Sequence, residues 1–333
     1  MQAHIDQARI EDVPAILEML KGVGLCPAPQ KLVHYFFTPP QAEYDAGTPG
    51  GFVVKDERGG CVGYCGLSPC RVYIGGKGYP AYQMGILGIK QGYGAMMFEL
   101  MDEVIALSHH ALVYANTANK KSLELWTNYA GFSMGPTACS RIQYAIGTPI
   151  DFCRGWAERF TTRANVKDFS DPLFRSFWER FRDSCQGVHT SRTPERLNWA
   201  FGKALKTGIC RLITIADETN VLGYAVLRVR PFKGLGLKRY DILDICVLDG
   251  KVETARSLLR ACKRYAASHL GVMLEYVGGI ATLDEVIKNE LPHSRPALAV
   301  TSFYATGIPE VYSALQGKSN WFFGPYDGDR CAL

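Results

Sequence analysis

The fold of this chain is decided by residues 86–95, which read Ile86-Leu87-Gly88-Ile89-Lys90-Gln91-Gly92-Tyr93-Gly94-Ala95. The segment begins as an apolar strand and runs into two glycines that one residue separates. Apolar residues then recur at helical spacing from Met96 to Ile105, which predicts a helix directly after the glycines. The free N–H groups of such a loop, together with the positive end of the helix dipole, bind phosphate. Glycine suits this loop because a Cβ would block the approach of a pyrophosphate.

A second segment follows the predicted helix and extends the pattern. Residues 110–115 form a predicted strand, and Asn119, Ser122 and the pair Gly131-Phe132 come after it. The order strand, Gly-x-Gly, helix, strand, Asn-x-x-Ser, helix, Gly-Phe resembles the GNAT superfamily of acyl-CoA-dependent N-acyltransferases. The resemblance covers about residues 5–145.

The resemblance implies an acetyl-CoA site in the first half of the chain. In this family the pantetheine inserts where the fourth strand separates from the next strand, here residues 80–88 and 111–115. Two positions depart from the family motif. Ile89 stands where the family has Arg or Gln, and the place of the family's acid tyrosine is Trp126 when counted from Asn119, or Thr127 when counted back from Gly131. The residues that the motif assigns to acyl-CoA binding are Ile86, Leu87, Gly88, Gln91, Gly92, Tyr93, Gly94, Ala95, Asn119, Ser122 and Trp126.

The resemblance also implies an amine acceptor, a proton acceptor and an acid that protonates the leaving thiolate. Tyr129 is the phenol closest to the position of the family's acid, although one additional residue before Gly131 shifts the register. The strand over residues 80–88 carries no Asp or Glu. Its candidate for proton transfer through water is Tyr82, with His34 and Asp45 as alternatives.

Residues 26–50 combine prolines with aromatic side chains, and the corresponding region of the family covers the acceptor site. For His34 and Tyr35, packing of a short helix is the alternative interpretation. Asp244 of the second half is also a candidate substrate contact if the cleft spans both halves. The candidate substrate contacts are His34, Tyr35, Tyr44, Asp45 and Asp244.

The chain repeats itself at an offset of 160 residues. Strand, polar hairpin and strand recur in residues 52–64 and 212–224, and the same offset relates Ser108-His109 to Ser268-His269. An offset that stays constant and preserves the order of elements predicts a tandem duplication. The strands expected in the first copy are residues 51–56, 61–69, 70–75 and 80–88.

We therefore expect an α/β fold with layered α+β architecture: two tandem GNAT-like units, each a mixed, mostly antiparallel sheet flanked by helices. Residues 1–146 are expected to form the unit with the acyl-CoA site, and residues 147–333 a degenerate unit. Val252 and Thr254 replace the two loop glycines in the second copy, which predicts one CoA per chain. The second copy then supplies substrate surface or dimer contacts, or it only stabilises the first.

Composition is typical of a cytoplasmic protein. The net charge of the 333 residues is only +5, with cations and anions interspersed, which argues against a nucleic-acid surface. No apolar run reaches the ~18 residues of a membrane helix, and the first residues lack the features of a signal peptide. The 11 cysteines include no C-x-x-C and are expected to be reduced core thiols. Neither Cys61, Cys65 and Cys70 nor Asp327 and Asp329 predict a metal site.

Three functions remain open on the sequence. The first is an acetyl-CoA-dependent N-acetyltransferase acting on a small-molecule or peptide amine, with a homodimer allowed. The second is a non-catalytic sensor of acyl-CoA, which the absent carboxylate on residues 80–88 favours. The third is an aminoacyl transferase of related tandem fold, against which the Gly92-Tyr93-Gly94 loop argues, because those proteins lack a working pyrophosphate loop in the first unit.

Overall fold

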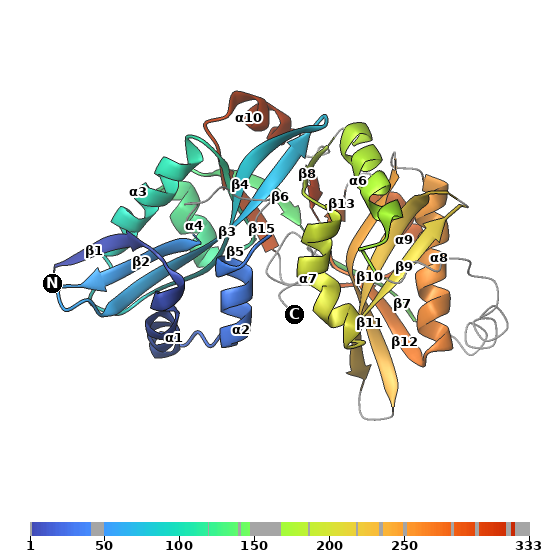
Figure 1. Ribbon diagram of the computed structural model, residues 1–333, viewed down its shortest axis with the longest axis horizontal. Coiled ribbons are helices and arrows are strands. Elements are labelled where there is room, and N and C mark those ends of the chain that lie inside the picture. The colour runs from blue at the N-terminus through green and yellow to red at the C-terminus, as the bar shows by residue number, and fades with distance from the viewer. Residues whose placement is uncertain are drawn as a thin grey trace.

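Two sheets flanked by helices lie side by side in the protein, as Figure 1 shows for this computed structural model. The expected α/β fold of two layered units is confirmed. The structure describes residues 2–40, 50–118, 120–138, 141–146, 168–185, 187–217, 219–232, 236–248, 252–280, 283–296, 300–317 and 321–323. No helix within these ranges has the length and apolar character needed to cross a membrane.

The first half follows the order that its hydrophobic pattern predicts. Helix α3 buries Met96, Leu100, Met101 and Val104, at the spacing that the sequence showed. The described elements are β1 (Ala3–Gln7), η1 (Ile10–Asp12), α1 (Val13–Gly22), α2 (Pro29–Leu32), η2 (Val33–Phe37), β2 (Gly51–Asp56), β3 (Cys61–Ile74), β4 (Lys77–Ile89), α3 (Met96–Ser108), β5 (Leu112–Ala118), α4 (Lys120–Asn128), β6 (Ser133–Ala138) and β7 (Arg141–Ile146).

The second half repeats much of this order and adds short elements at its end. The described elements are α6 (Pro172–Ser184), β8 (Val188–Thr190), α7 (Pro194–Lys206), β9 (Cys210–Ala216), β10 (Val221–Phe232), β11 (Leu237–Val247), α8 (Val252–Ser268), β12 (Gly271–Tyr276), β13 (Gly279–Ile280), α9 (Asp284–Glu290), β14 (His293–Pro296), β15 (Val300–Ala305), α10 (Pro309–Leu315) and β16 (Trp321–Phe323).

The larger sheet is covered on both faces. Its strand order is β13-β16-β8-β3-β4-β5-β15-β6, and β2 and β1 extend it beside β3. On one face, Ile16 and Leu20 of α1 pack with Phe36 of η2. On the other face, Leu100 of α3 and Trp126 of α4 share one apolar cluster. The smaller sheet has the order β14-β7-β12-β11-β10-β9.

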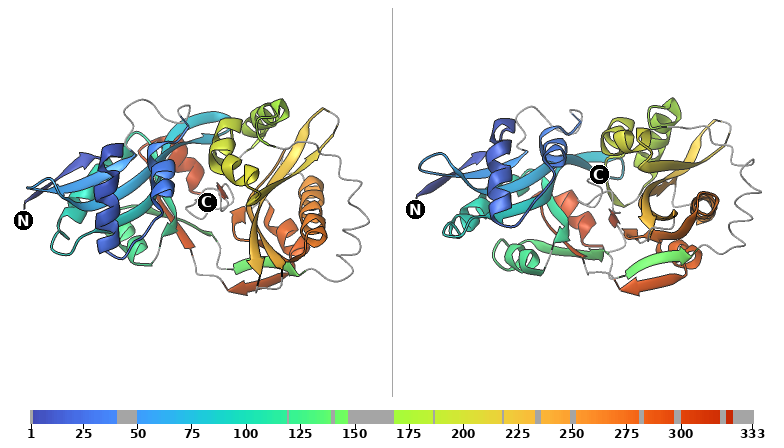
Figure 2. Two further views of the ribbon diagram at one scale, coloured as in Figure 1. Left: turned by 60° about the horizontal axis from the view of Figure 1, so that its bottom comes forward. Right: turned by 90° about the horizontal axis from the view of Figure 1, so that it is seen from below.

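Each half contributes one strand to the interior of the other half's sheet. Strand β7 of the first half lies in the smaller sheet, antiparallel to both β12 and β14. Strand β15 of the second half lies in the larger sheet, antiparallel to both β5 and β6. In Figure 2 the green strand β7 accordingly runs beside the orange strands of the second half. The two sheets therefore do not divide at residue 146, where the sequence placed the boundary between units.

The repeat also contains a shift that the sequence comparison missed. Leu67 pairs with Met84 in the first copy and Leu227 pairs with Ile242 in the second. Leu227 follows Leu67 by 160 residues, but Ile242 follows Met84 by only 158. The β10–β11 hairpin is thus two residues shorter than the β3–β4 hairpin. Asp244 consequently corresponds to Ile86 and not to Met84.

Candidate functional site

Strands β4 and β5 separate part-way along the larger sheet. They are hydrogen-bonded in parallel only where Ala81–Gln83 meets Leu112–Tyr114, although β4 continues to Ile89 and β5 to Ala118. Beyond Gln83, the edge of β4 that faced β5 has no strand partner among the described residues. Strand backbone without a partner strand offers N–H and C=O groups to an extended ligand.

A β-bulge bends β4 immediately beyond this point. Gly85 and Ile86 together lie opposite Gly66 of β3, and a bulge of this kind turns a strand away from its neighbour. The ring of Phe36 packs across the bulge, and a Cβ would lie 2.5 Å from it at Gly85 and 2.8 Å at Gly66. Packing of Phe36 therefore accounts for these two glycines without a ligand.

The loop between β4 and α3 has a different need for glycine. Gly92 has φ +93°, a conformation that other residues rarely adopt. At Gly94 a Cβ would have no heavy atom within 4 Å, so packing inside the protein does not require glycine there. Both glycines are exposed. Within the described residues no hydrogen bond engages either N–H group, so both donors are available to a ligand.

Helix α3 begins at Met96, directly after this loop, and continues for 13 residues. Its N-terminus adds a partial positive charge to the free N–H groups, and Gln91 and Ala95 of the loop are exposed as well. Free N–H groups at the start of a helix are the features that phosphate-binding loops share. The sequence-predicted residues Gln91, Gly92, Gly94 and Ala95 are thus brought together in one exposed turn.

The other predicted acyl-CoA residues of this region divide between the two faces of β4, because successive strand side chains alternate. Leu87 packs on the cluster that faces α3 and α4, as do Tyr93 and the catalytic candidate Tyr82. Ile86 packs on the opposite cluster, with Phe36. Gly88 is buried, and a Cβ there would lie 3.1 Å from the side chain of Val23 and 3.2 Å from that of Leu20 in α1.

The α4 residues lie in different surroundings. Trp126 is 1% exposed, and its ring packs at 5.1 Å from Phe132 and at 5.8 Å from Phe303 of the exchanged strand β15. A ligand would contact Trp126 only after this core opened. Ser122 is partly exposed on α4, whereas Asn119 lies outside the described residues.

The acid candidate Tyr129 follows α4 and is 70% exposed. Its ring contacts Phe98 of α3 at a centroid distance of 5.9 Å, edge to face. Tyr82 lies half-buried against the apolar cluster beneath α3 and α4. Tyr129 and Tyr82 thus contact different residues and do not contact each other.

The residues that were predicted to contact an acceptor meet the second half of the chain. His34 stacks on Trp199 of α7 at 4.6 Å, and its Nε2 lies 3.0 Å from the Trp199 carbonyl oxygen. Trp199 donates from Nε1 to the Thr38 carbonyl oxygen at 2.7 Å. Tyr35 is buried beside the same tryptophan. Helix α7 was missed as a part of this region, and the only signal in the sequence was a tryptophan on an amphipathic helix. Tyr44 and Asp45 lie outside the described residues.

The contact with α7 also sets the protonation of His34. Partial burial lowers the pKa of His34, the positive charges of Arg196 and Lys203 lower it further, and the hydrogen bond to the Trp199 carbonyl opposes them. The neutral ring is therefore favoured near pH 7. Because a carbonyl oxygen can only accept, we assign the proton to Nε2. Nδ1 then carries the lone pair that can accept a proton.

Asp244 lies in a closed polar group formed by residues of the second half. It is fully buried, and Arg192 donates to its two carboxylate oxygens at 3.1 and 3.2 Å. Tyr224 donates a third hydrogen bond at 2.6 Å, and burial and the charge of Asp244 raise the pKa of Tyr224. Asp244 would contact an acceptor amine only after this buried pair opened, at a cost of several kcal/mol.

Cys61 and Cys65 of strand β3 are buried thiols. Burial raises the pKa of Cys61 to about 11 and that of Cys65 to about 12, so both are thiols near pH 7. Within the described part of the chain, no three His, Cys, Asp or Glu side chains are grouped so that they could hold a metal ion.

Solved structures share this fold across most of the chain. A GCN5-related N-acetyltransferase from Anabaena variabilis is 12% identical, with a TM-score of 0.57, over 91% of this chain and 72% of that protein. A probable N-acyltransferase from Enterococcus faecalis is 12% identical, with a TM-score of 0.60, over 92% and 73%. Eis1 from Mycobacterium abscessus is 11% identical, with a TM-score of 0.53, over 94% and 76%.

No family model matches the chain, and no curated protein matches it significantly in sequence. At identities of 11–12% the likeness to solved structures establishes the fold and not the reaction. The chain therefore has the fold of the GCN5-related N-acetyltransferases, as the residues around Gly92 and Gly94 predicted.

Proposed function

We propose that the protein is an acyl-CoA-dependent N-acyltransferase whose first half binds acetyl-CoA and transfers the acetyl group to an amine. The separation of β4 from β5 carries this proposal. It leaves strand backbone without a partner directly before the exposed glycine loop and the start of α3. This combination occurs here in the fold of proteins known as N-acetyltransferases.

The residues present fit the cofactor. The N–H groups of Gly92 and Gly94 make no hydrogen bond among the described residues, and a Cβ at Gly94 would stand in open space that a pyrophosphate could fill. The unpaired edge of β4 beyond Gln83 is the part of the chain that would hold the pantetheine. Acetyl-CoA supplies the acetyl group as an activated thioester.

The chain itself contributes hydrogen-bond donors and a proton acceptor. N–H groups of β4 that are aimed at a carbonyl oxygen stabilise the negative charge that develops on it during acyl transfer. An amine must lose a proton to attack, and the neutral ring of His34 offers Nδ1 for this proton, directly or through water. Tyr129 is the candidate that returns a proton to the leaving thiolate.

Product formation with a panel of amines tests the proposal. Full-length protein is incubated with acetyl-CoA and polyamines, amino acids or peptides, and released CoA is measured by chromatography, because the 11 cysteines would consume a thiol reagent. We expect CoA release that depends on one class of amine. CoA binding without release in any arm would support a sensor, and absence of CoA binding would overturn the proposal.

A further inference from the structure

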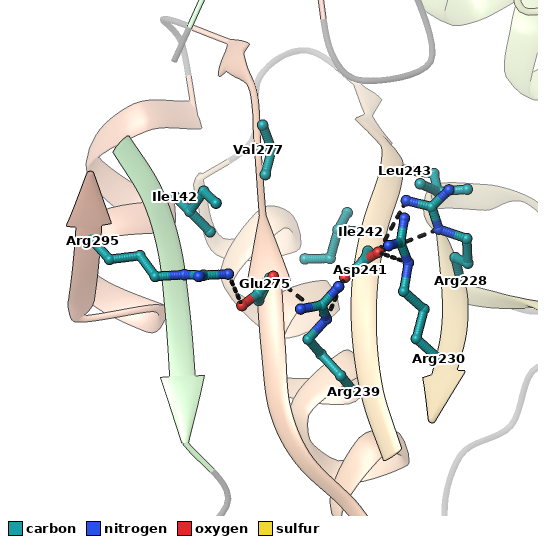
Figure 3. A pocket seen from close by; sticks show the side chains of 10 residues that line it. All are labelled: Ile142, Arg228, Arg230, Arg239, Asp241, Ile242, Leu243, Glu275, Val277 and Arg295. Atoms are coloured by element: carbon teal, nitrogen blue, oxygen red, sulfur yellow. Dashed lines mark hydrogen bonds and ion pairs between the residues drawn. The ribbon is translucent and has the colours of Figure 1, made fainter. Parts of the chain in front are cut away.

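A cavity of about 300 Å³ lies on the smaller sheet. Its charged lining comes from four strands, and Figure 3 shows these side chains on one face of the sheet. They are Arg228 and Arg230 of β10, Arg239 and Asp241 of β11, Glu275 of β12 and Arg295 of β14. Ile142 of the exchanged strand β7 and Val277 form apolar parts of the wall.

The cavity carries an excess of positive charge. Four guanidinium groups and two carboxylates line it, which gives a formal charge of 4 − 2 = +2. Asp241 alone receives Arg228 at 3.0 Å, Arg230 at 2.7 Å and Arg239 at 3.2 Å. The Nε of Arg239 makes no hydrogen bond at that distance, so one carboxylate does not satisfy three guanidinium groups.

Two arginines also oppose each other directly across the sheet. Arg230 pairs with Arg239 between β10 and β11, and like charges in such a pair destabilise a sheet. Burial lowers the pKa of Arg230, and the charges of Arg228 and Arg239 add to this effect against the opposing charge of Asp241. An anion in the cavity would offset this repulsion.

The first half shows that the fold does not require these charges. The cross-strand pairs that correspond to Arg228–Asp241 and Arg230–Arg239 are Ser68–Gln83 and Cys70–Ala81. All four of these residues are at most 3% exposed. Cys70 and Ala81 belong to an apolar cluster with residues of β8 and α10. At these positions the first half has a buried, uncharged face, whereas the second half has a charged, open one.

We propose that this cavity, the arginine pocket, binds a small anionic ligand with a carboxylate or phosphate group. Guanidinium groups recognise both oxyanions through paired N–H donors. The volume lies at the lower end of the range for small-molecule sites, so the ligand is a small molecule and not a polymer. The apolar wall at Ile142 and Val277 accommodates a short apolar group attached to the anion.

Calorimetry on the full-length protein tests the proposal with inorganic phosphate and pyrophosphate in one arm and acetate and hexanoate in the other. We expect one molecule of at least one probe per chain, with an affinity that falls as salt rises. Arg230→Gln with Arg295→Gln removes both excess charges. These are the more exposed of the four arginine side chains, at 42% and 47%, so the fold should tolerate the change. Binding should weaken by about 10-fold or more.

A matched control has the same change in net charge. Arg175→Gln with Lys288→Gln removes two exposed cations that also belong to ion pairs but do not line the cavity. Glu275→Gln provides a variant of opposite sign, since it raises the charge of the pocket and should tighten binding. The proposal is overturned if no probe binds at 10 mM, roughly the weakest affinity that calorimetry resolves. Equal weakening in the control, or no tightening in Glu275→Gln, would also overturn it. CoA titration of the Arg230→Gln, Arg295→Gln protein should be unchanged, which separates this pocket from the loop at Gly92.

Discussion

Replacement of Gly92 by valine separates binding of CoA from stability of the fold. Gly92 has φ +93°, so a β-branched residue strains the loop by about 1–3 kcal/mol. The strain stays local because Gly92 is exposed. The bound pyrophosphate would lose at least one hydrogen bond from a backbone N–H to a charged oxygen, which contributes about 1.5–3 kcal/mol. We therefore expect Gly92→Val to weaken CoA binding by about 10- to 150-fold.

Two further variants separate the effect of backbone strain from the effect of lost contacts to CoA. Gly59 has φ +77° in an exposed turn with no heavy atom within 4 Å of a Cβ, so Gly59→Val introduces comparable strain away from the loop. Gly94 lacks a left-handed φ, and a Cβ there has open space, so Gly94→Ala should not change the melting temperature. Calorimetry with CoA and thermal melts are run on all three. The reasoning is refuted if Gly92→Val binds CoA as tightly as Gly59→Val and the wild type.

Three other predictions concern the same site. CoA should bind once per chain, because only four residues separate β11 from α8 where six separate β4 from α3; a ratio of two by calorimetry would contradict this. Tyr129→Phe should lower turnover by roughly 10²-fold with unchanged CoA affinity if the phenol protonates the thiolate, and an unchanged rate would leave the exposed ring without a catalytic role. The value of kcat/KM should fall as His34 is protonated below the ordinary histidine pKa. Lys203→Gln removes a charge that lowers this pKa and should move the acid limb to higher pH; a limb that stays in place would assign it to another group.

The sequence predicted the parts of the site that depend on local chemistry. Two glycines between a strand and an amphipathic helix sufficed to predict the loop, because backbone conformation and helix position follow from neighbouring residues. The splitting of residues 61–75 into two strands was wrong, since β3 is continuous across Pro69. Leu67 N–H and Arg71 C=O both face the side of Gly50 and Ser191. Pro69 lies two residues from both Leu67 and Arg71, so its backbone faces the same side as theirs. The hydrogen bond that a proline cannot donate is therefore missing in the gap between β2 and β8, and the pairing of β3 with β4 is not affected.

Long-range arrangement could not be predicted in the same way. The 160-residue offset indicated duplication, but strand patterns do not say which sheet a strand joins. Strands β7 and β15 occupy equivalent places in each other's sheets, β7 between β12 and β14 and β15 between β5 and β6. The candidates Trp126 and Asp244 depended on register, and their burial follows from partners far away in sequence, Phe303 and Arg192. The surroundings of His34 could not be predicted for the same reason, because its neighbour Trp199 is 165 residues away in sequence.

The exchange of strands explains why the second half persists although it lacks the glycine pair. Strand β15 completes the larger sheet between β5 and β6, and its Phe303 packs against Trp126 beneath α4. Helix α7 places Trp199 against His34. Strand β8 pairs with the part of the β3 edge that β2 does not cover. The larger sheet and the surroundings of His34 are thus built from both halves. A second copy held by these contacts could lose its own loop glycines without penalty, and its open sheet face was free to acquire the arginine pocket.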